Sequence, residues 1–289
     1  RAIVDYLEND WTDGENFLEL PVQVTKPEGS AEDLAYVKDL LGSFTTSFST
    51  SSADRSKNVN SGAKHVNGTV LYPGETFSMY ETVAPFTAEN GYAMAGSYLN
   101  GEVVDSMGGG ICQVSTTLYN AVLRAELEVV ERSPHSMTVH YVELSEDAAI
   151  AGTYKDFKFV NSTEYPIYIE GYTTSDKKIT FNIYGKETRD KNRTISFESQ
   201  IVSETPATTI LQEDAGQGIG YKAVSSKGSS GYVAELYKIV KVNGVQTDRI
   251  KINKSTYKGS DRVVTYGTAG DPTLSENLRA AIAAQDEAL

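Results

Sequence analysis

The sequence predicts an α+β fold: a mixed domain with a cysteine at a helix N-terminus, followed by a small all-β module. Three glycines precede Cys112, and apolar residues recur on one side of the segment after it, as in a buried helix. From Ile195 to about Thr268 the chain is rich in valine, isoleucine, tyrosine and threonine, which favour strands. Between these regions, strands are expected at Thr138–Val142, Lys155–Val160, Tyr165–Tyr172 and Lys178–Tyr184.

The elements before Cys112 are assigned from caps and turns. Residues 1–29 combine a helix-like start with an extended stretch and are interpreted as the end of a preceding region. Ser30 is expected to cap a helix that runs through Leu41. A second helix is expected over residues 57–65. The mixed domain is therefore placed at residues 30–185.

The second half is expected to begin after a polar linker at residues 186–193. An all-β module then covers residues 194–270, with a hairpin that turns at Asn243-Gly244. Residues 271–289 are interpreted as an amphipathic tail without an assigned function.

Cys112 is the strongest candidate for a reactive group. Glycines ahead of a helix allow a tight bend and leave amide N–H groups free at the helix start. The positive end of the helix dipole favours a thiolate over a thiol. The alternative is that Cys112 is a small, inert residue in the core. The glycine run favours the reactive interpretation.

His135 lies 23 residues after Cys112 and past a strand-like run, so it can return to the helix N-terminus. A Cys112–His135 pair would be a nucleophile with its base. His140 is the second candidate for the base, on the assumption that it lies on the strand predicted at residues 138–142. His65 is expected on the surface of the second helix, without a catalytic role.

Composition excludes several classes of function. The net charge is −13 and no block of basic residues occurs, so nucleic acids and anionic membranes are poor partners. The single cysteine and three histidines have no metal-ligand spacing, and no cofactor is expected. No apolar run is long enough to span a membrane or to act as a signal peptide. Because the chain begins at Arg1, we expect an export signal or anchor upstream and an extracellular location.

Residues 40 to 185 resemble VanW-type domains, a family of bacterial cell-envelope proteins associated with vancomycin-resistance clusters. The resemblance is carried by a series of short motifs in the same order. They are Arg55 with Asn58, Asn67-Gly68, Pro73–Ser78, Gly91-Tyr92, Gly108–Asn120, Glu131-Arg132, His135-Ser136, Asp147-Ala148 and Asp156–Phe159 with Asn161. Proteins of this family often carry a peptidoglycan-binding region ahead of the domain, which is the role implied for residues 1–29.

The family resemblance implies an L,D-transpeptidase of peptidoglycan with Cys112 as nucleophile and His135 as its base. Cys112 would take an acyl group from one stem peptide and pass it to an amine of another, forming a three-to-three crosslink. The amides of Ile111 and Cys112 are the candidate oxyanion hole. Candidates for binding the substrate are Arg55 and Arg132, for its carboxylates, and Ser115, Thr116 and Ser136, for hydrogen bonds near the thiol. For both arginines, an ion pair within the protein is an equal alternative to binding the substrate. For Ser115, capping of the helix is an equal alternative.

Two further functions remain compatible with the sequence. One is a cysteine amidase or endopeptidase in which water resolves the thioester, and the other is a non-catalytic module for wall binding or antibiotic response. The sequence identifies neither the stem peptide nor the oligomeric state. The residues after 194 resemble the G-five module through Gly231-Tyr232, Tyr257 and Val263–Thr268. That resemblance implies an elongated sheet that binds wall glycan, with a structural spacer as the alternative.

Overall fold

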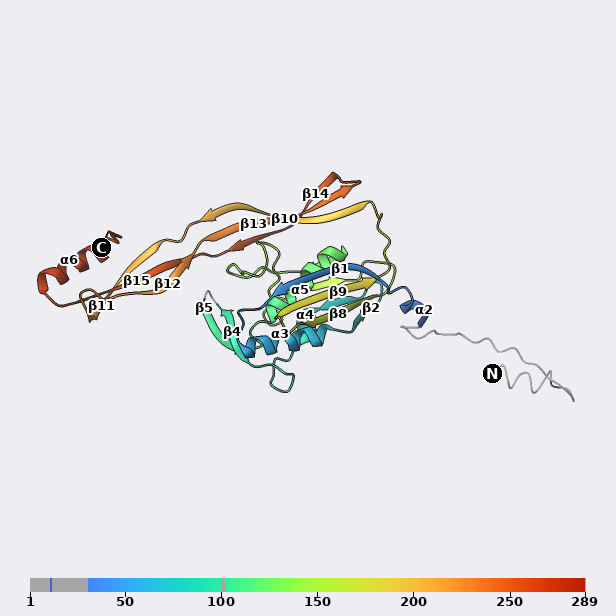
Figure 1. Ribbon diagram of the computed structural model, residues 1–289, viewed down its shortest axis with the longest axis horizontal. Helices are drawn as coiled ribbons and strands as arrows, with labels where there is room; N and C mark the ends of the chain where they lie inside the picture. Colours follow the sequence, from blue (N-terminus) through green and yellow to red (C-terminus); the bar gives the residue numbers. More distant parts are fainter. Residues whose placement is uncertain (1–10, 12–30, 100–101, 289) are drawn as a thin grey trace. The chain divides into compact units, whose positions relative to one another are not determined.

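The computed structural model describes Trp11, residues 31–99 and residues 102–288 (Figure 1). Contacts divide the chain into a unit of residues 1–35 and a unit of residues 36–289. Helix α2 (Ala31–Leu34) belongs to the first unit. The predicted cap Ser30 and nearly all of residues 1–29 lie outside the described residues.

The first half of the larger unit mixes helices and strands. Its elements are β1 (Asp39–Ser47), α3 (Ala53–Val66), β2 (Thr69–Leu71), β3 (Thr76–Ser78), α4 (Met79–Val83), β4 (Met94–Leu99), β5 (Glu102–Met107), α5 (Ile111–Ala125), β6 (Glu128–Glu131), β7 (Lys158–Val160), β8 (Ile167–Thr173) and β9 (Lys178–Gly185). Strands β8 and β9 and the helix that begins before Cys112 were predicted, and the observed mixture confirms the mixed character of this half.

A four-stranded antiparallel sheet in the order β1-β9-β8-β2 forms the centre of this half. Alternate side chains of β9, at Ile179, Phe181 and Ile183, are fully buried, as the period of two predicts. Helix α5 packs on β1 and β9, and α3 packs on β8, so both helices lie along this sheet (Figure 1). The sheet therefore supports the N-terminal end of α5.

Two predicted elements differ in the structure. The helix expected from Ser30 to Leu41 was wrong, because α2 ends at Leu34 and β1 begins at Asp39. Pairing of β1 with β9 supplies backbone hydrogen bonds that the local helical pattern did not reveal. The strand expected at Thr138–Val142 was also wrong, since this segment has no strand.

The segment that replaces the predicted strand is a long connection, here called the site loop, residues 132–157, between β6 and β7. Contacts with α5 fix its path. Thr116 Oγ1 accepts a hydrogen bond from the Ala148 amide at 3.0 Å, and Asn120 Nδ2 donates to the Glu146 carbonyl at 2.7 Å. These bonds hold the middle of the site loop against the buried helix.

The second half contains long strands and one helix. Its elements are β10 (Arg193–Thr205), β11 (Thr209–Gly218), β12 (Lys222–Ser229), β13 (Gly231–Val242), β14 (Val245–Tyr257), β15 (Ser260–Ala269) and α6 (Pro272–Ala283). The sheets have the orders β10-β13-β14 and β11-β15-β12, and the predicted hairpin at Asn243-Gly244 joins β13 to β14. The expected tail forms α6, whose Ile282 packs with Leu211 and Val264.

The two halves share one hydrophobic core. Leu236 of β13 is fully buried in the same cluster as the apolar residues of α5, and Phe197 and Ile252 pack against that cluster. Ion pairs join the halves as well, because Glu126 at the end of α5 binds Arg193 at 2.5 Å and Lys238 at 2.8 Å. The second half is therefore packed directly on the first.

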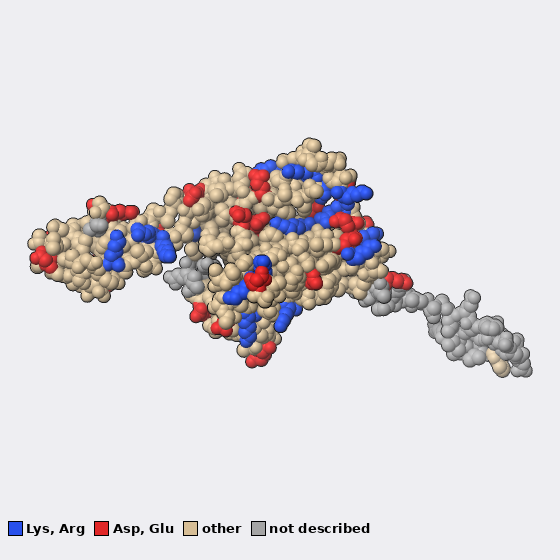
Figure 2. All heavy atoms as spheres, viewed as in Figure 1, with Lys and Arg blue, Asp and Glu red and all other residues tan. Residues whose placement is uncertain are grey.

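The surface carries charges of both signs. On the face shown in Figure 2, basic and acidic side chains are interspersed, without a large block of either sign. Within the described residues, no helix combines the length and apolar character that crossing a membrane requires.

Candidate active site

The N-terminus of α5 is built by the glycine run that the sequence indicated. Gly110 precedes the helix with φ of 108°, in the left-handed region that favours glycine. A Cβ on Gly109 would lie 2.2 Å from the Ala95 carbonyl oxygen, so only glycine allows this close approach. The turn places Cys112 in the first turn of a helix whose other residues are mostly buried.

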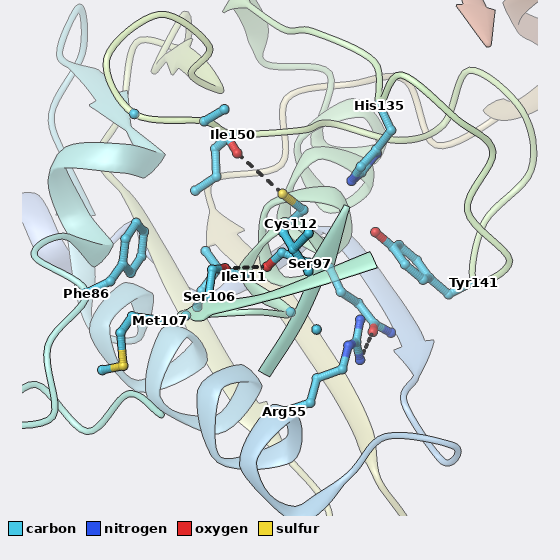
Figure 3. A pocket seen from close by; sticks show the side chains of 17 residues that line it. Arg55, Phe86, Ser97, Ser106, Met107, Ile111, Cys112, His135, Tyr141 and Ile150 are labelled. Carbon is cyan, nitrogen blue, oxygen red and sulfur yellow. Dashed lines mark hydrogen bonds between the residues drawn. The ribbon is translucent and has the colours of Figure 1, made fainter. Parts of the chain in front are cut away.

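The Cys112 thiol lies at a pocket and is partly exposed (Figure 3). Its Sγ is 3.4 Å from the Ile150 carbonyl oxygen of the site loop. The pocket has a volume of about 280 Å³, and apolar side chains such as Phe86 and Met107 line one part of it. His135 and Tyr141 also line it, and in Figure 3 both side chains point toward Cys112. The thiol is therefore accessible from a cavity that also contains an imidazole.

His135 and Asp147 form a buried pair beside the thiol. Asp147 Oδ2 is 2.7 Å from His135 Nδ1 and accepts a second hydrogen bond, also of 2.7 Å, from the His135 backbone amide. Because Nδ1 faces the carboxylate, the other ring nitrogen is left for the Cys112 thiol, which lines the same pocket as His135. Cys112, His135 and Asp147 thus have the arrangement of a nucleophile, a base and a carboxylate that orients the base.

The protonation of this trio follows from its contacts. Burial raises the pKa of the Cys112 thiol, but the neighbouring His135 imidazole outweighs burial and brings the pKa below its usual value. Burial lowers the pKa of His135, yet its bonds to Asp147 and Cys112 raise it to about 9. Burial raises the pKa of Asp147, and its contacts with His135 and Arg132 lower it overall. Relative to isolated side chains, the site therefore favours the charged form of each of the three groups.

The amides proposed as an oxyanion hole differ in their partners. The Ile111 N–H donates to the Gly108 carbonyl at 3.1 Å, so the turn already uses it. For the Cys112 N–H, no acceptor occurs among the described residues. Burial, followed by the charge of nearby Cys112, raises the pKa of Tyr141, which keeps this phenol protonated and able to donate. The Cys112 amide, with the Tyr141 hydroxyl, is the better candidate pair to bind an oxyanion.

Arg55 of α3 lines the same pocket. Its Nη1 donates to Ser51 Oγ at 2.5 Å and to Gln113 Oε1 at 2.9 Å. Among the described residues no carboxylate pairs with Arg55, so the ion pair considered from the sequence does not occur there. Arg55 also lines a second pocket of about 670 Å³, and Gln113 and Tyr141 are common to both pockets. Its guanidinium is available to a ligand in either one.

Arg132 has a different environment. Its Nη2 donates to Asp147 Oδ1 at 2.9 Å and its Nη1 to Ser255 Oγ at 2.9 Å, and the side chain is 6% exposed. The structure therefore places Arg132 behind Asp147, as an internal ion pair.

The three hydroxyl candidates lie apart from the thiol. Ser115 is fully buried within α5, and its Oγ has no hydrogen-bond partner among the described residues. Thr116 binds the backbone of Ala148 in the site loop. Ser136 is exposed, and its carbonyl accepts from the Lys258 amide at 2.7 Å. None of the three lines the thiol pocket.

The other histidines are separate from Cys112. His65 lies in α3, where its ring stacks on Tyr92 with 5.6 Å between centroids. His140 is exposed and lines the second pocket but not the thiol pocket. Within the described part of the chain, no group of three or more histidine, cysteine, aspartate or glutamate side chains is arranged to hold a metal ion.

Sequence reasoning did not assign roles to Asp147, Tyr141 and Tyr257. Asp147 belongs to one of the recognised motifs, and a buried acid 12 residues after His135 was a usable signal. Tyr141 was interpreted as a strand residue, so its place in the pocket was missed. Tyr257 donates to Asp147 Oδ1 at 2.5 Å from the other half of the chain, a contact for which the local sequence carries no signal.

Comparisons with known proteins agree with the motifs. Residues 54–184 match the family described as VanW like protein, and residues 197–269 match the G5 domain. "Uncharacterized protein YoaR" of Bacillus subtilis is 39% identical over 157 residues, which are 54% of this chain and 52% of that protein. "Vancomycin B-type resistance protein VanW" of Enterococcus faecalis is 31% identical over 134 residues, or 44% of this chain and 48% of that protein.

The chain thus spans about half the length of these curated relatives. Among solved structures, "IgA1 Protease G5 domain structure" matches in full, covering 29% of this chain with 22% identity and a TM-score of 0.21. The two matched segments follow each other in the order that the motifs predicted: a VanW-like domain over residues 54–184 is followed by a G5 domain over residues 197–269.

Proposed function

We propose that this chain acts on peptidoglycan as an L,D-transpeptidase, with Cys112 as the nucleophile. The observation that carries the proposal is the Cys112–His135–Asp147 arrangement at the wall of a pocket. A thiolate stabilised by an imidazolium attacks carbonyl groups at neutral pH. Because the imidazolium is a proton donor, the same pair can protonate a leaving amine.

In the first step, the Cys112 thiolate attacks the carbonyl that joins the third stem residue to the terminal D-alanine. The C–N bond breaks, His135 gives its proton to the nitrogen of the departing D-alanine, and a thioester forms on Sγ. The negative oxygen of the tetrahedral intermediate is bound by the Cys112 amide and the Tyr141 hydroxyl. Asp147 keeps His135 oriented and remains ionised throughout.

In the second step, the side-chain amine of a neighbouring stem attacks the thioester carbonyl. Neutral His135 takes a proton from that amine, the C–S bond breaks, and the thiolate and imidazolium are restored. The product is a three-to-three crosslink. This step requires room for a second peptide next to the acylated cysteine. The two pockets that meet at Arg55, Gln113 and Tyr141 support an amine acceptor over water.

Arg55 is the proposed contact for a substrate carboxylate. A guanidinium binds carboxylates with parallel hydrogen bonds, and stem peptides end in a carboxylate. The absence of an acidic partner for Arg55 among the described residues supports this role. Arg132, which binds Asp147, is assigned to the support of the triad instead.

A location at the cell wall supports the same substrate. The G5 domain and the name of the relative from Enterococcus faecalis, a vancomycin resistance protein, both favour an extracellular, peptidoglycan-associated protein. We propose that the long strands of the G5 domain contact wall glycan, with tyrosines such as the half-exposed Tyr221 as stacking surfaces.

The proposal is tested by incubating the protein with disaccharide-tetrapeptide and analysing the products by mass spectrometry. A dimer joined through two third-position residues, with release of D-alanine, is the expected product. Disaccharide-tripeptide alone would identify a hydrolase that uses the same cysteine. An unchanged substrate, with full labelling of Cys112 by iodoacetamide, would contradict an enzymatic role on this substrate.

A further inference from the structure

Tyr257 brings the G5 domain into contact with the triad. It lies at the end of β14, and its side chain is 3% exposed. Its hydroxyl donates to Asp147 Oδ1 at 2.5 Å and accepts a hydrogen bond from the Ser145 amide at 2.7 Å. A single phenol therefore binds both the carboxylate that orients His135 and the backbone two residues before that carboxylate.

Hydrogen bonds to Asp147 are divided between its two oxygens. Oδ2 accepts from the backbone and the ring of His135, whereas Oδ1 accepts from Arg132 and Tyr257. A carboxylate bound on both oxygens cannot rotate about its Cβ–Cγ bond without losing several charge-assisted bonds. Tyr257 thus fixes the plane of the carboxylate that faces His135.

Other contacts of the G5 domain surround the same stretch of the site loop. Ser255, also of β14, accepts from Arg132 at 2.9 Å, and the Ala234 carbonyl of β13 accepts from Ser145 Oγ at 3.0 Å. The Lys258 amide donates to the Ser136 carbonyl at 2.7 Å, one residue after His135. Strands β13 and β14, with the residue directly after β14, therefore bind the site loop before His135 and between His135 and Asp147.

We propose that Tyr257 is a positioning residue for the His135–Asp147 pair, so that the G5 domain completes the active site of the VanW-like domain. The inference rests on the proposed function in its use of Cys112 and His135 as nucleophile and base. Without the phenol hydroxyl, Asp147 loses a bond on Oδ1 and the buried Ser145 amide loses its acceptor. The carboxylate then holds the imidazolium less firmly, and a smaller fraction of Cys112 is thiolate at neutral pH.

The test is Tyr257→Phe in the full chain, which keeps the ring and its packing and removes only the hydroxyl. The matched control is Tyr237→Phe on β13, whose hydroxyl donates to Glu235 at 2.6 Å within the G5 domain. Two quantities are measured: the pH dependence of Cys112 alkylation, and kcat and KM for crosslinking. Thermal unfolding of both variants reports on the fold.

For Tyr257→Phe, the pH midpoint of alkylation should move upward. kcat should fall about 10-fold, the effect of losing one hydrogen bond to a charged group, with KM within about twofold of the starting protein. Tyr237→Phe should change neither. In an Asp147→Asn background, Tyr257→Phe should have almost no further effect on kcat, because both changes act on one unit.

An unchanged alkylation profile in Tyr257→Phe would overturn the inference, even if the variant melted at a lower temperature. Equal effects of Tyr257→Phe with and without Asp147→Asn would also overturn it. Alkylation separates this inference from the proposed function, because it needs no peptidoglycan. If the protein formed no crosslinks but Tyr257→Phe moved the alkylation midpoint, transpeptidation would fail and the positioning role would stand.

Discussion

The VanW-like domain and the G5 domain use their strands in different ways. In β8 and β9, alternate side chains such as Ile169 and Phe181 are fully buried under two helices. In β10 all side chains from residue 200 to 205 are exposed, as are those of β14 from residue 245 to 251. The buried apolar residues of the G5 strands are instead concentrated on β13, at Leu236, Ile239 and Val240, and in a small cluster with α6.

This difference explains where the G5 domain obtains its stability. The free energy of apolar burial grows with the area removed from water, so sheets with exposed faces gain little of it. Leu236 of the G5 domain is buried in the core of the VanW-like domain. The part of the G5 sheet that is buried is also the part that contacts the site loop. Because of this shared surface, the two domains are not structurally independent, even if one carries the proposed chemistry and the other the proposed wall binding.

Replacing the proposed nucleophile should distinguish the two domains most strongly. Cys112→Ala should lower crosslinking by at least about 10⁴-fold, because Cys112 is the residue proposed to form the acyl-enzyme. Binding to the wall should remain, since the G5 strands are unchanged. Crosslinking is measured by mass spectrometry of muropeptides and wall binding by sedimentation with insoluble sacculi. Residual crosslinking by Cys112→Ala at more than a hundredth of the normal rate would refute this assignment.

The two buried or half-buried histidines provide the next comparison. His135→Ala should reduce crosslinking by about 10²-fold or more, the usual contribution of positioned proton transfer. His65→Ala should leave crosslinking near normal, because His65 lies in α3, stacks on Tyr92 and does not line the thiol pocket. Steady-state rates of both variants, with circular dichroism as a check of folding, decide the matter. Comparable losses in the two variants would remove the special role of His135.

The pH dependence of acylation follows from the shifted pKa of His135. The pKa of His135 is raised to about 9 by Asp147 and Cys112 against the effect of burial, so acylation should be lost as the pH rises through about 9. The stability gained from the charged imidazole is complete below its ordinary pKa of about 6.5 and disappears over the same upper range. Single-turnover acylation from pH 6 to about 10 measures this limb. An acylation rate that still rises between pH about 9 and about 10 would show that neutral His135 suffices.

Glu126 tests whether ion pairs between the two domains contribute to the stability of the fold. Its side chain is 14% exposed and pairs with Arg193 and Lys238 across the domain boundary. Burial raises its pKa, and these partners lower it to about 2. Glu126→Gln should reduce the free energy of unfolding by about 1–3 kcal/mol. This contribution exists above the usual carboxyl pKa of about 4.3 and is lost as the pH falls toward about 2.

The control for that variant is Glu198→Gln, which removes an exposed ion pair with Arg249 inside the G5 domain. Such pairs contribute about 0–1 kcal/mol. Urea unfolding at pH 7 and near pH 3 compares the two. Equal, small effects at pH 7 would mean that the boundary ion pairs do not stabilise the packed arrangement.

Local patterns in the sequence predicted the elements whose causes are local. The glycine run placed the start of α5, and the Asn243-Gly244 turn placed the β13–β14 hairpin. The strands expected at Tyr165–Tyr172 and Lys178–Tyr184 correspond to β8 and β9, in which buried positions recur along one face. In each of these cases, neighbouring residues along the chain determine the structure.

The elements that the sequence did not predict depend on distant partners. Residues 138–142 alternate like a strand but form none, because the site loop follows bonds to α5 at Thr116 and Asn120. Proximity of Cys112 and His135 was proposed from the sequence, whereas the role of Asp147 required its contact with His135. The contribution of Tyr257 was unpredictable, because it is 110 residues from the carboxylate that it binds.

Mass measurement of the intact protein during turnover tests the central claim most directly. After mixing with disaccharide-tetrapeptide and rapid acid quenching, the protein should gain the mass of the donor less one D-alanine. Peptide mapping should place this addition on Cys112, and an added amine acceptor should remove it while crosslinked dimer forms. An unmodified Cys112 during active crosslinking, or the same adduct on Cys112→Ala, would contradict the account.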